Sequence, residues 1–198
     1  MTKKVLLGAL VGGIVVFIVG ALLHTVLGLG EVGVKALPQE ETVLSAMRAA
    51  IPASGFYIFP APNMTPGRTK EQQQADMNAY TAKYQQGPSG ILVYSTGSGV
   101  GLNYGKLLGG EFVIDVVSAF FLACILAMGA GGVSSYWKRV FAVTLASLFA
   151  AVFLGLEYWN WYNFPTTYTC AYILNGVLDW FFAGLAMAAI VKQPSPAR

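Results

Sequence analysis

The sequence predicts an all-α membrane protein with four transmembrane helices and a small α+β extracytoplasmic insert between the first two helices. One observation is compositional: 56% of the 198 residues are hydrophobic and only 11% are charged, whereas soluble domains have about 25% charged residues. The other is that four separate stretches approach the length of about 20 apolar residues with which a helix crosses a bilayer. These stretches are residues 5–28, 107–130, 140–156 and 169–191.

The first apolar stretch is interpreted as an uncleaved transmembrane anchor. Lys3 and Lys4 precede it, as they would precede the apolar region of a signal peptide. However, residues 5–28 form a run longer than the roughly 7–15 residues of a signal peptide, and no small-x-small cleavage site follows. We therefore expect transmembrane helix 1 within residues 1–28.

The segment 29–106 is too long for a simple connection, which usually has about 4–6 residues. Its pattern predicts a helix–strand–helix–strand unit, with the second helix capped by Thr69 and Gln72. The expected elements are ETVLSAMRAA, SGFYIFPAP ending at Pro60, TKEQQQADMNAYTAKYQQ and ILVYS. We expect the strands to pair and the helices to cover one face. Such a core is too small to stand alone comfortably, so the unit is expected to rest on the helices or on a partner.

The distribution of basic residues predicts the orientation. If the N-terminus is cytoplasmic, the inner segments contain basic residues and no acidic ones, which agrees with the positive-inside rule. Residues 29–106 then face the periplasm, and residues 107–198 hold helices 2–4 and a short cytoplasmic tail. We accordingly expect a bacterial inner-membrane protein with both termini cytoplasmic. The inner basic residues are Lys3, Lys4, Lys138, Arg139, Lys192 and Arg198.

Polar side chains recur inside the predicted spans, where they are costly and usually face protein or water. At 100° per residue each of these side chains falls on a face rich in polar or small residues, so we expect all of them to face the interior of the bundle. His24 and Glu111 should lie at similar depth near the outer end, Asp115 one turn deeper and Asp179 near the midplane. These candidate intramembrane polar and packing residues are His24, Glu111, Asp115, Asn175 and Asp179.

Each of these residues has a structural and a functional interpretation. Glu111 either snorkels toward Lys106 or lines a pathway, and Asp115 is either neutral or an acceptor for a hydroxyl group. Asp179 either forms an interhelical hydrogen bond beside Asn175 or carries protons. His24 is either a packing residue or a ligand to a haem or chlorin. A mixed metal site of His24, Glu111 and Asp115 is a further alternative, although no metal site is assigned and the cofactor is left unknown.

The stretch EYWNWYNFPTTYT, residues 157–169, contains two of the four tryptophans. We expect it to connect the last two spans at the outer surface. Aromatic side chains with one polar group prefer the membrane interface, so an interface belt is the preferred interpretation and a ligand-stacking platform is the alternative. The belt residues are Tyr158, Trp159, Trp161, Tyr162 and Phe164.

No catalytic signature is found in the sequence, which has no nucleophile elbow, HExxH or CxxC motif. Nucleic acid is excluded as a partner because the net charge is only +3 and no basic stretch interleaves with aromatic residues. The pattern of GFYIFP and GPSGILVY in the insert and YWNWYNFP between the last spans resembles uncharacterised four-pass bacterial membrane proteins, a resemblance that implies no activity.

The preferred functional hypothesis is a non-catalytic subunit or scaffold of a larger inner-membrane complex, of respiratory or photosynthetic type. Its partners would be the lipid bilayer and other membrane protein subunits. The alternative is a small proton-coupled carrier that uses Glu111, Asp115 and Asp179. An intramembrane enzyme is ranked last.

Overall fold

The computed structural model describes residues 2–97, 101–129 and 135–192. These residues divide into two units, which are described separately. The first unit, residues 1–34 and 102–198, contains the long apolar helices, and the second, residues 35–101, is here called the insert. The predicted end of the second span at Ala130 and the inner residue Arg198 lie outside the described residues.

The four predicted spans are present as helices long and apolar enough to cross a membrane, so the chain is a multi-pass membrane protein of all-α type. Their ends differ from the predicted ends by a few residues, because helices continue through polar residues until a turn conformation stops them. The helices are α1 (Thr2–Thr25), α4 (Tyr104–Met128), α5 (Tyr136–Tyr162) and α6 (Thr166–Ile190).

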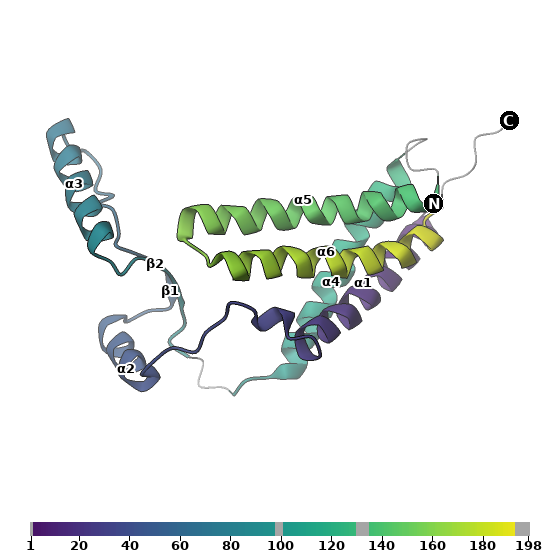
Figure 1. The fold of residues 1–198 in the computed structure, drawn as a ribbon, viewed down its shortest axis with the longest axis horizontal. Coiled ribbons are helices and arrows are strands. Elements are labelled where there is room, and N and C mark those ends of the chain that lie inside the picture. Colours follow the sequence, from purple (N-terminus) through teal and green to yellow (C-terminus); the bar gives the residue numbers. More distant parts are fainter. Residues whose placement is uncertain (1, 98–100, 130–134, 193–198) are drawn as a thin grey trace. The chain divides into compact units, whose positions relative to one another are not determined.

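The helices of the first unit pack in the order α4, α1, α6, α5, which is not their order in the chain. Figure 1 shows α1 beside α4 and α5 beside α6, with the members of each pair running in opposite directions. Although α4 and α5 are consecutive, they share far fewer contacts than the other neighbours. Helix α1 therefore packs between α4 and the α5–α6 pair, which it contacts through α6. The short 3-10 helix η1 (Leu29–Glu31) follows α1.

Glycines on α1 allow this close packing. A methyl group added at Gly12 would lie 2.7 Å from the Met187 sulfur, and one at Gly13 would lie 2.7 Å from the Val116 Cα. Only glycine leaves room for helix backbones to approach this closely. The surrounding core is fully apolar and includes Val16, Ala119, Ala123, Leu126, Val143, Ala183 and Met187.

Helices α5 and α6 are joined by hydrogen bonds at one end. Arg139 is only 5% exposed, and its Nε donates to the Ala188 carbonyl at 3.0 Å. The Tyr136 hydroxyl donates to the Leu185 carbonyl at 3.0 Å. Both carbonyls lie in the last two turns of α6, near the helix C-terminus, where the Arg139 cation is favourable. Arg139 therefore has a packing role, besides its place among the predicted inner basic residues.

The insert contains α2 (Glu40–Ala50), β1 (Gly55–Phe59), α3 (Lys70–Gln86) and β2 (Gly90–Tyr94). The two strands pair antiparallel, with Phe56 opposite Val93 and Ile58 opposite Ile91. The expectation that the helices cover one face of the strands is wrong, because within residues 35–97 neither α2 nor α3 packs along this two-stranded ribbon. Apolar side chains occur on both faces of the ribbon, with Phe56 and Val93 on one face and Phe59 and Leu92 on the other.

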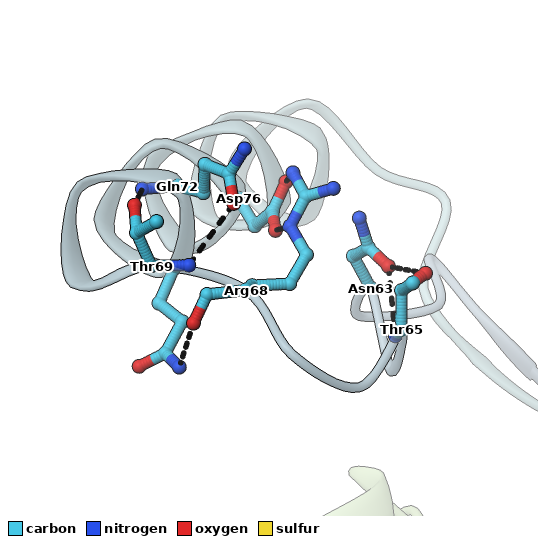
Figure 2. Close-up of polar contacts among 7 residues, drawn as sticks. Asn63, Thr65, Arg68, Thr69, Gln72 and Asp76 are labelled. Carbon is cyan, nitrogen blue, oxygen red and sulfur yellow. Dashed lines mark hydrogen bonds and ion pairs between the residues drawn. The ribbon is translucent and has the colours of Figure 1, made fainter.

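The start of α3 confirms the predicted cap. Thr69 and Gln72 form a capping box, in which the Thr69 amide donates to the Gln72 side chain at 3.0 Å. Arg68 forms a two-point ion pair with Asp76, with Nε 2.7 Å from Oδ2 and Nη2 2.9 Å from Oδ1 (Figure 2). Hydrogen bonds from its own backbone amide and from Thr69 lower the pKa of Glu71. This end of the insert is thus held by local polar contacts.

The packing of α1 predicts that Gly13→Ala destabilises the protein by about 1–3 kcal/mol, because the added methyl group meets the Val116 backbone. Gly109→Ala is the matched control, since a methyl group at Gly109 on α4 meets nothing within 4 Å. The temperature of unfolding in a mild detergent measures both. Equal unfolding temperatures for the two variants would contradict the close approach of α1 to α4.

Candidate functional site

A pocket of about 520 Å³ lies among α1, α4 and α6. It brings together four of the five predicted intramembrane polar residues, which come from three different helices. Its walls include His24 from α1, Glu111 and Asp115 from α4, and Asp179 from α6. Phe17 and Trp180 contribute aromatic surface to the same pocket. The buried apolar core begins at Val16, which also lines the pocket, and includes residues of α1, α4, α5 and α6.

Helix periodicity and a glycine position these side chains. Glu111 and Asp115 are one turn apart on α4 and therefore lie on the same face. Asp179 approaches α1 at Gly20, where an added methyl group would lie 3.6 Å from the Asp179 Oδ1. A larger residue at Gly20 would crowd this carboxylate and reduce the pocket.

The two deeper carboxylates lack partners. Asp115 is 6% exposed, and no hydrogen bond or ion pair to its carboxylate is made by any residue that the structure describes. The Asp179 Oδ1 is buried and has no hydrogen-bond partner in the described chain. The predicted interhelical hydrogen bond beside Asn175 is therefore not observed. An unpartnered buried oxygen such as the Asp179 Oδ1 costs free energy, so it indicates a pocket arranged for something other than internal packing.

Asn175 lies outside this pocket, in a neighbouring cavity of about 70 Å³. His24 lines both cavities and thus lies between them. The Asn175 Oδ1 is buried and also lacks a hydrogen-bond partner within the described residues. The five predicted polar residues therefore occupy two adjoining cavities.

The surroundings of His24 do not fit a haem or chlorin. Its Nδ1 lies 3.1 Å from the Gly20 carbonyl oxygen of its own helix. The opposite edge of the ring, with Cδ2 and Nε2, lies against Gly30, the central residue of η1. A macrocycle coordinated by Nε2 would have to displace this segment. A metal site also lacks support, since in residues 2–97, 101–129 and 135–192 no three His, Cys, Asp or Glu side chains are placed to hold one ion.

The structure corrects the prediction for residues 157–169. They are not a loop, because α5 continues to Tyr162 and α6 begins at Thr166, leaving only Asn163–Pro165 as the connection. Asn163 ends α5 with a positive φ of 55°, which asparagine tolerates better than most residues. Aromatic residues weaken a helix only slightly. Helix α5 therefore continues through them and ends at Asn163, two residues before Pro165.

Three of the five predicted belt residues, Tyr158, Tyr162 and Phe164, belong to a connected row of aromatic rings. Tyr158 contacts Tyr162 and stacks on Phe164, whose ring contacts Tyr168, and Tyr168 in turn stacks on Tyr172. Four of these rings surround a cavity of about 170 Å³ at the same ends of α5 and α6. The sequence analysis missed Phe17 and Trp180 in the polar pocket. Trp180 could have been found because it directly follows Asp179.

Trp159 differs from Trp161 in its contacts. The Trp159 Nε1 donates to the Thr166 Oγ1 at 3.0 Å and thereby joins the end of α5 to the start of α6.

We expect Trp159→Phe to lose about 0.5–1.5 kcal/mol of stability, because this hydrogen bond is lost. Trp161 is 69% exposed, so Trp161→Phe should change the stability little. Thr166→Val should cost a similar amount to Trp159→Phe, and the double variant should cost little more. Unfolding temperatures measure these losses. If the losses of the two single variants add up in the double variant, Trp159 and Thr166 do not form a hydrogen bond with each other.

No family model matches the chain, and neither the curated proteins nor the solved structures contain a significant match.

Proposed function

We propose that the chain is a non-catalytic membrane subunit or scaffold of a larger bacterial inner-membrane complex, of respiratory or photosynthetic type. The observation that carries this proposal is the exposure of the insert. No described residue of the insert, in 35–97 and at 101, is buried. A folded segment with two helices and a ribbon but no core is best explained by a surface that another protein covers.

The two-stranded ribbon is the part of the insert that most needs to pack against another surface. Paired residues of an antiparallel ribbon point to the same face, so Phe56, Ile58, Ile91 and Val93 form one apolar face. Phe56 is 57% exposed and Val93 is 79% exposed. A two-stranded ribbon is marginally stable alone and needs packing against another element. A neighbouring subunit would supply that packing and bury this face.

The proposed orientation places both termini in the cytoplasm and the insert in the periplasm. Support comes from the basic residues near the predicted inner helix ends, among them Lys3, Lys4, Lys138 and Lys192. The insert, which is on the other side in this arrangement, has basic and acidic residues in nearly equal number. Periplasmic placement would make the apolar ribbon available to the outer part of a partner subunit.

A proton-coupled carrier is the second candidate, and the polar pocket favours it. Glu111, Asp115 and Asp179 would be the proton-binding groups. Against this role, the core that includes Ala119, Ala183 and Met187 is fully buried and apolar. A pathway from the pocket across the membrane would therefore have to open that core. The subunit role needs no such movement.

The subunit proposal predicts that the natural protein copurifies with other membrane proteins in a mild detergent. Phe56→Asp combined with Val93→Asp should abolish copurification while leaving membrane insertion unchanged, because a charge on this face cannot be buried at low cost. Thr81→Asp, which adds a charge at an exposed position of α3, is the control. A homogeneous protein without other subunits, in both natural and variant forms, would contradict the proposal.

The orientation is tested by labelling single cysteines in a variant with Cys124→Ala and Cys170→Ala. A membrane-impermeant thiol reagent applied to intact spheroplasts should label Thr81→Cys in the insert and spare Thr2→Cys at the N-terminus. Both positions are exposed in the structure. Labelling of Thr2→Cys but not of Thr81→Cys would show that the protein has the opposite orientation.

A further inference from the structure

The pocket among α1, α4 and α6 contains an unbalanced set of ionisable groups. Three carboxylic side chains line it, from Glu111, Asp115 and Asp179, and its lining includes no lysine or arginine. His24 is the only other titratable group of the lining. Because carboxylates in a low-dielectric environment attract cations strongly, the natural complement of this pocket is a positively charged ligand.

Burial of the carboxylates provides an independent observation. Asp115 lines the pocket and is 94% buried, since its exposed fraction is 6%, and it has no hydrogen-bond or ion-pair partner among the described side chains. The Asp179 Oδ1 is likewise buried and unpartnered in the described part of the chain. Buried polar groups are normally hydrogen-bonded. Two such groups from facing helices therefore indicate acceptor positions for a donor that is not part of this chain.

The size and walls of the pocket distinguish between kinds of cation. A bare metal ion is disfavoured, because no three potential ligands among the described residues are placed around one point. A volume of about 520 Å³ also leaves room for an organic group. Phe17, Leu108 and Trp180 give the pocket apolar and aromatic walls, against which a hydrocarbon chain or ring would pack and a cation would be attracted. The ligand should therefore combine a cationic end with an apolar body.

The acceptors also select the type of cationic end. Carboxylate oxygens accept hydrogen bonds, and a primary ammonium group offers three N–H donors. Asp115 and Asp179 line the pocket from different helices, so the donors of one ammonium group can be divided between these two carboxylates. A quaternary ammonium group has no N–H donor and would leave the carboxylate oxygens unpartnered. A primary ammonium group is therefore the better complement.

We propose that this pocket binds a primary ammonium group attached to an apolar body. This ligand site is additional to the proposed subunit role and does not depend on it. Two sources offer the same chemistry, namely the headgroup of an aminophospholipid and a free arylalkylamine. His24 lies in the last turn of α1, close to the end of the predicted span, so a lipid headgroup can reach the pocket from the bilayer surface. A free amine would enter from the same end.

The first experiment measures the binding of 2-phenylethylammonium to the purified full-length protein, or to its complex if one is isolated, by titration calorimetry. Its N,N,N-trimethyl analogue is the matched ligand. The primary amine should bind saturably, and the quaternary analogue should bind about tenfold more weakly or less, because its charge-assisted hydrogen bonds are lost. Equal binding of the two would overturn the assignment of Asp115 and Asp179 as hydrogen-bond acceptors.

The second experiment tests the lipid source. The protein is placed in nanodiscs of phosphatidylcholine containing a small fraction of phosphatidylethanolamine, and retained lipids are identified by native mass spectrometry. Preferential retention of phosphatidylethanolamine supports the proposal with a lipid as ligand. Saturable binding of 2-phenylethylammonium without such retention supports it with a free amine. Failure of both probes to bind the folded natural protein would overturn the proposal.

Variants locate the binding. Asp115→Asn and Asp179→Asn preserve size and should each weaken binding of the primary amine or lipid by about tenfold or more, since an amide lacks the negative charge. Glu157→Gln is the control, because Glu157 is an exposed acid on α5 that does not line the pocket. Unfolding temperatures show whether each variant is folded. Unchanged binding in folded Asp115→Asn and Asp179→Asn variants would place the ligand elsewhere and overturn the proposal.

Discussion

The close approach of α1 to α4 and α6 is the packing constraint on which the rest of the membrane unit depends. Helix α1 is the shared neighbour of both helices, whereas α4 and α5 contact each other little. Within a bilayer there is little hydrophobic gain from helix association, so close van der Waals contact has to supply much of the stability. Gly8, Gly12 and Gly13 are buried on α1. The lack of side chains at these positions permits that contact.

The same helix also explains the polar pocket. Along the first half of α1, glycines and apolar partners produce a tightly packed core. Beyond Val16, the facing residues are carboxylic and aromatic, and the helices enclose a pocket instead. One end of the unit is therefore packed, and the other encloses a pocket. The proposed binding of a ligand at one end needs no opening of the packed core, whereas transport through the protein would need it.

Several features could be predicted from the sequence because they depend on local patterns. The four spans follow from long apolar runs, and the cap of α3 follows from the spacing of Thr69 and Gln72. Helix periodicity predicts Glu111 and Asp115 on one face of α4, and both residues line the pocket. The separation of Asn175 into a second cavity could not be predicted, since it depends on how η1 meets α6.

Other features depend on three-dimensional packing or on competing local signals. The aromatic stretch after Gly155 was predicted to be a loop, because its tryptophans and asparagines suggested an interface connection, but only Asn163 and Pro165 interrupt the helices. The role of Arg139 could not be predicted, because its acceptor at Ala188 is 49 residues away in the chain. For the same reason the spatial order of the helices is not evident from their order in the sequence.

Cross-linking between α1 and α4 tests the central claim most directly. An added Cβ at Gly8 lies 3.7 Å from the Ala123 Cβ, which matches the roughly 3.5–4.5 Å of a disulfide. A Cβ at Gly8 also lies 2.5 Å from the Val191 Cγ2, so Val191→Ala is included to make room for the new side chain. In this variant, which also lacks Cys124 and Cys170, the pair Gly8→Cys and Ala123→Cys should form an intramolecular disulfide when native membranes are oxidised. The pair Ala151→Cys and Gly176→Cys, with a corresponding separation of 3.5 Å between α5 and α6, is the positive control. Cross-linking of the control pair without cross-linking of the Gly8 and Ala123 pair would contradict the placement of α1 against α4.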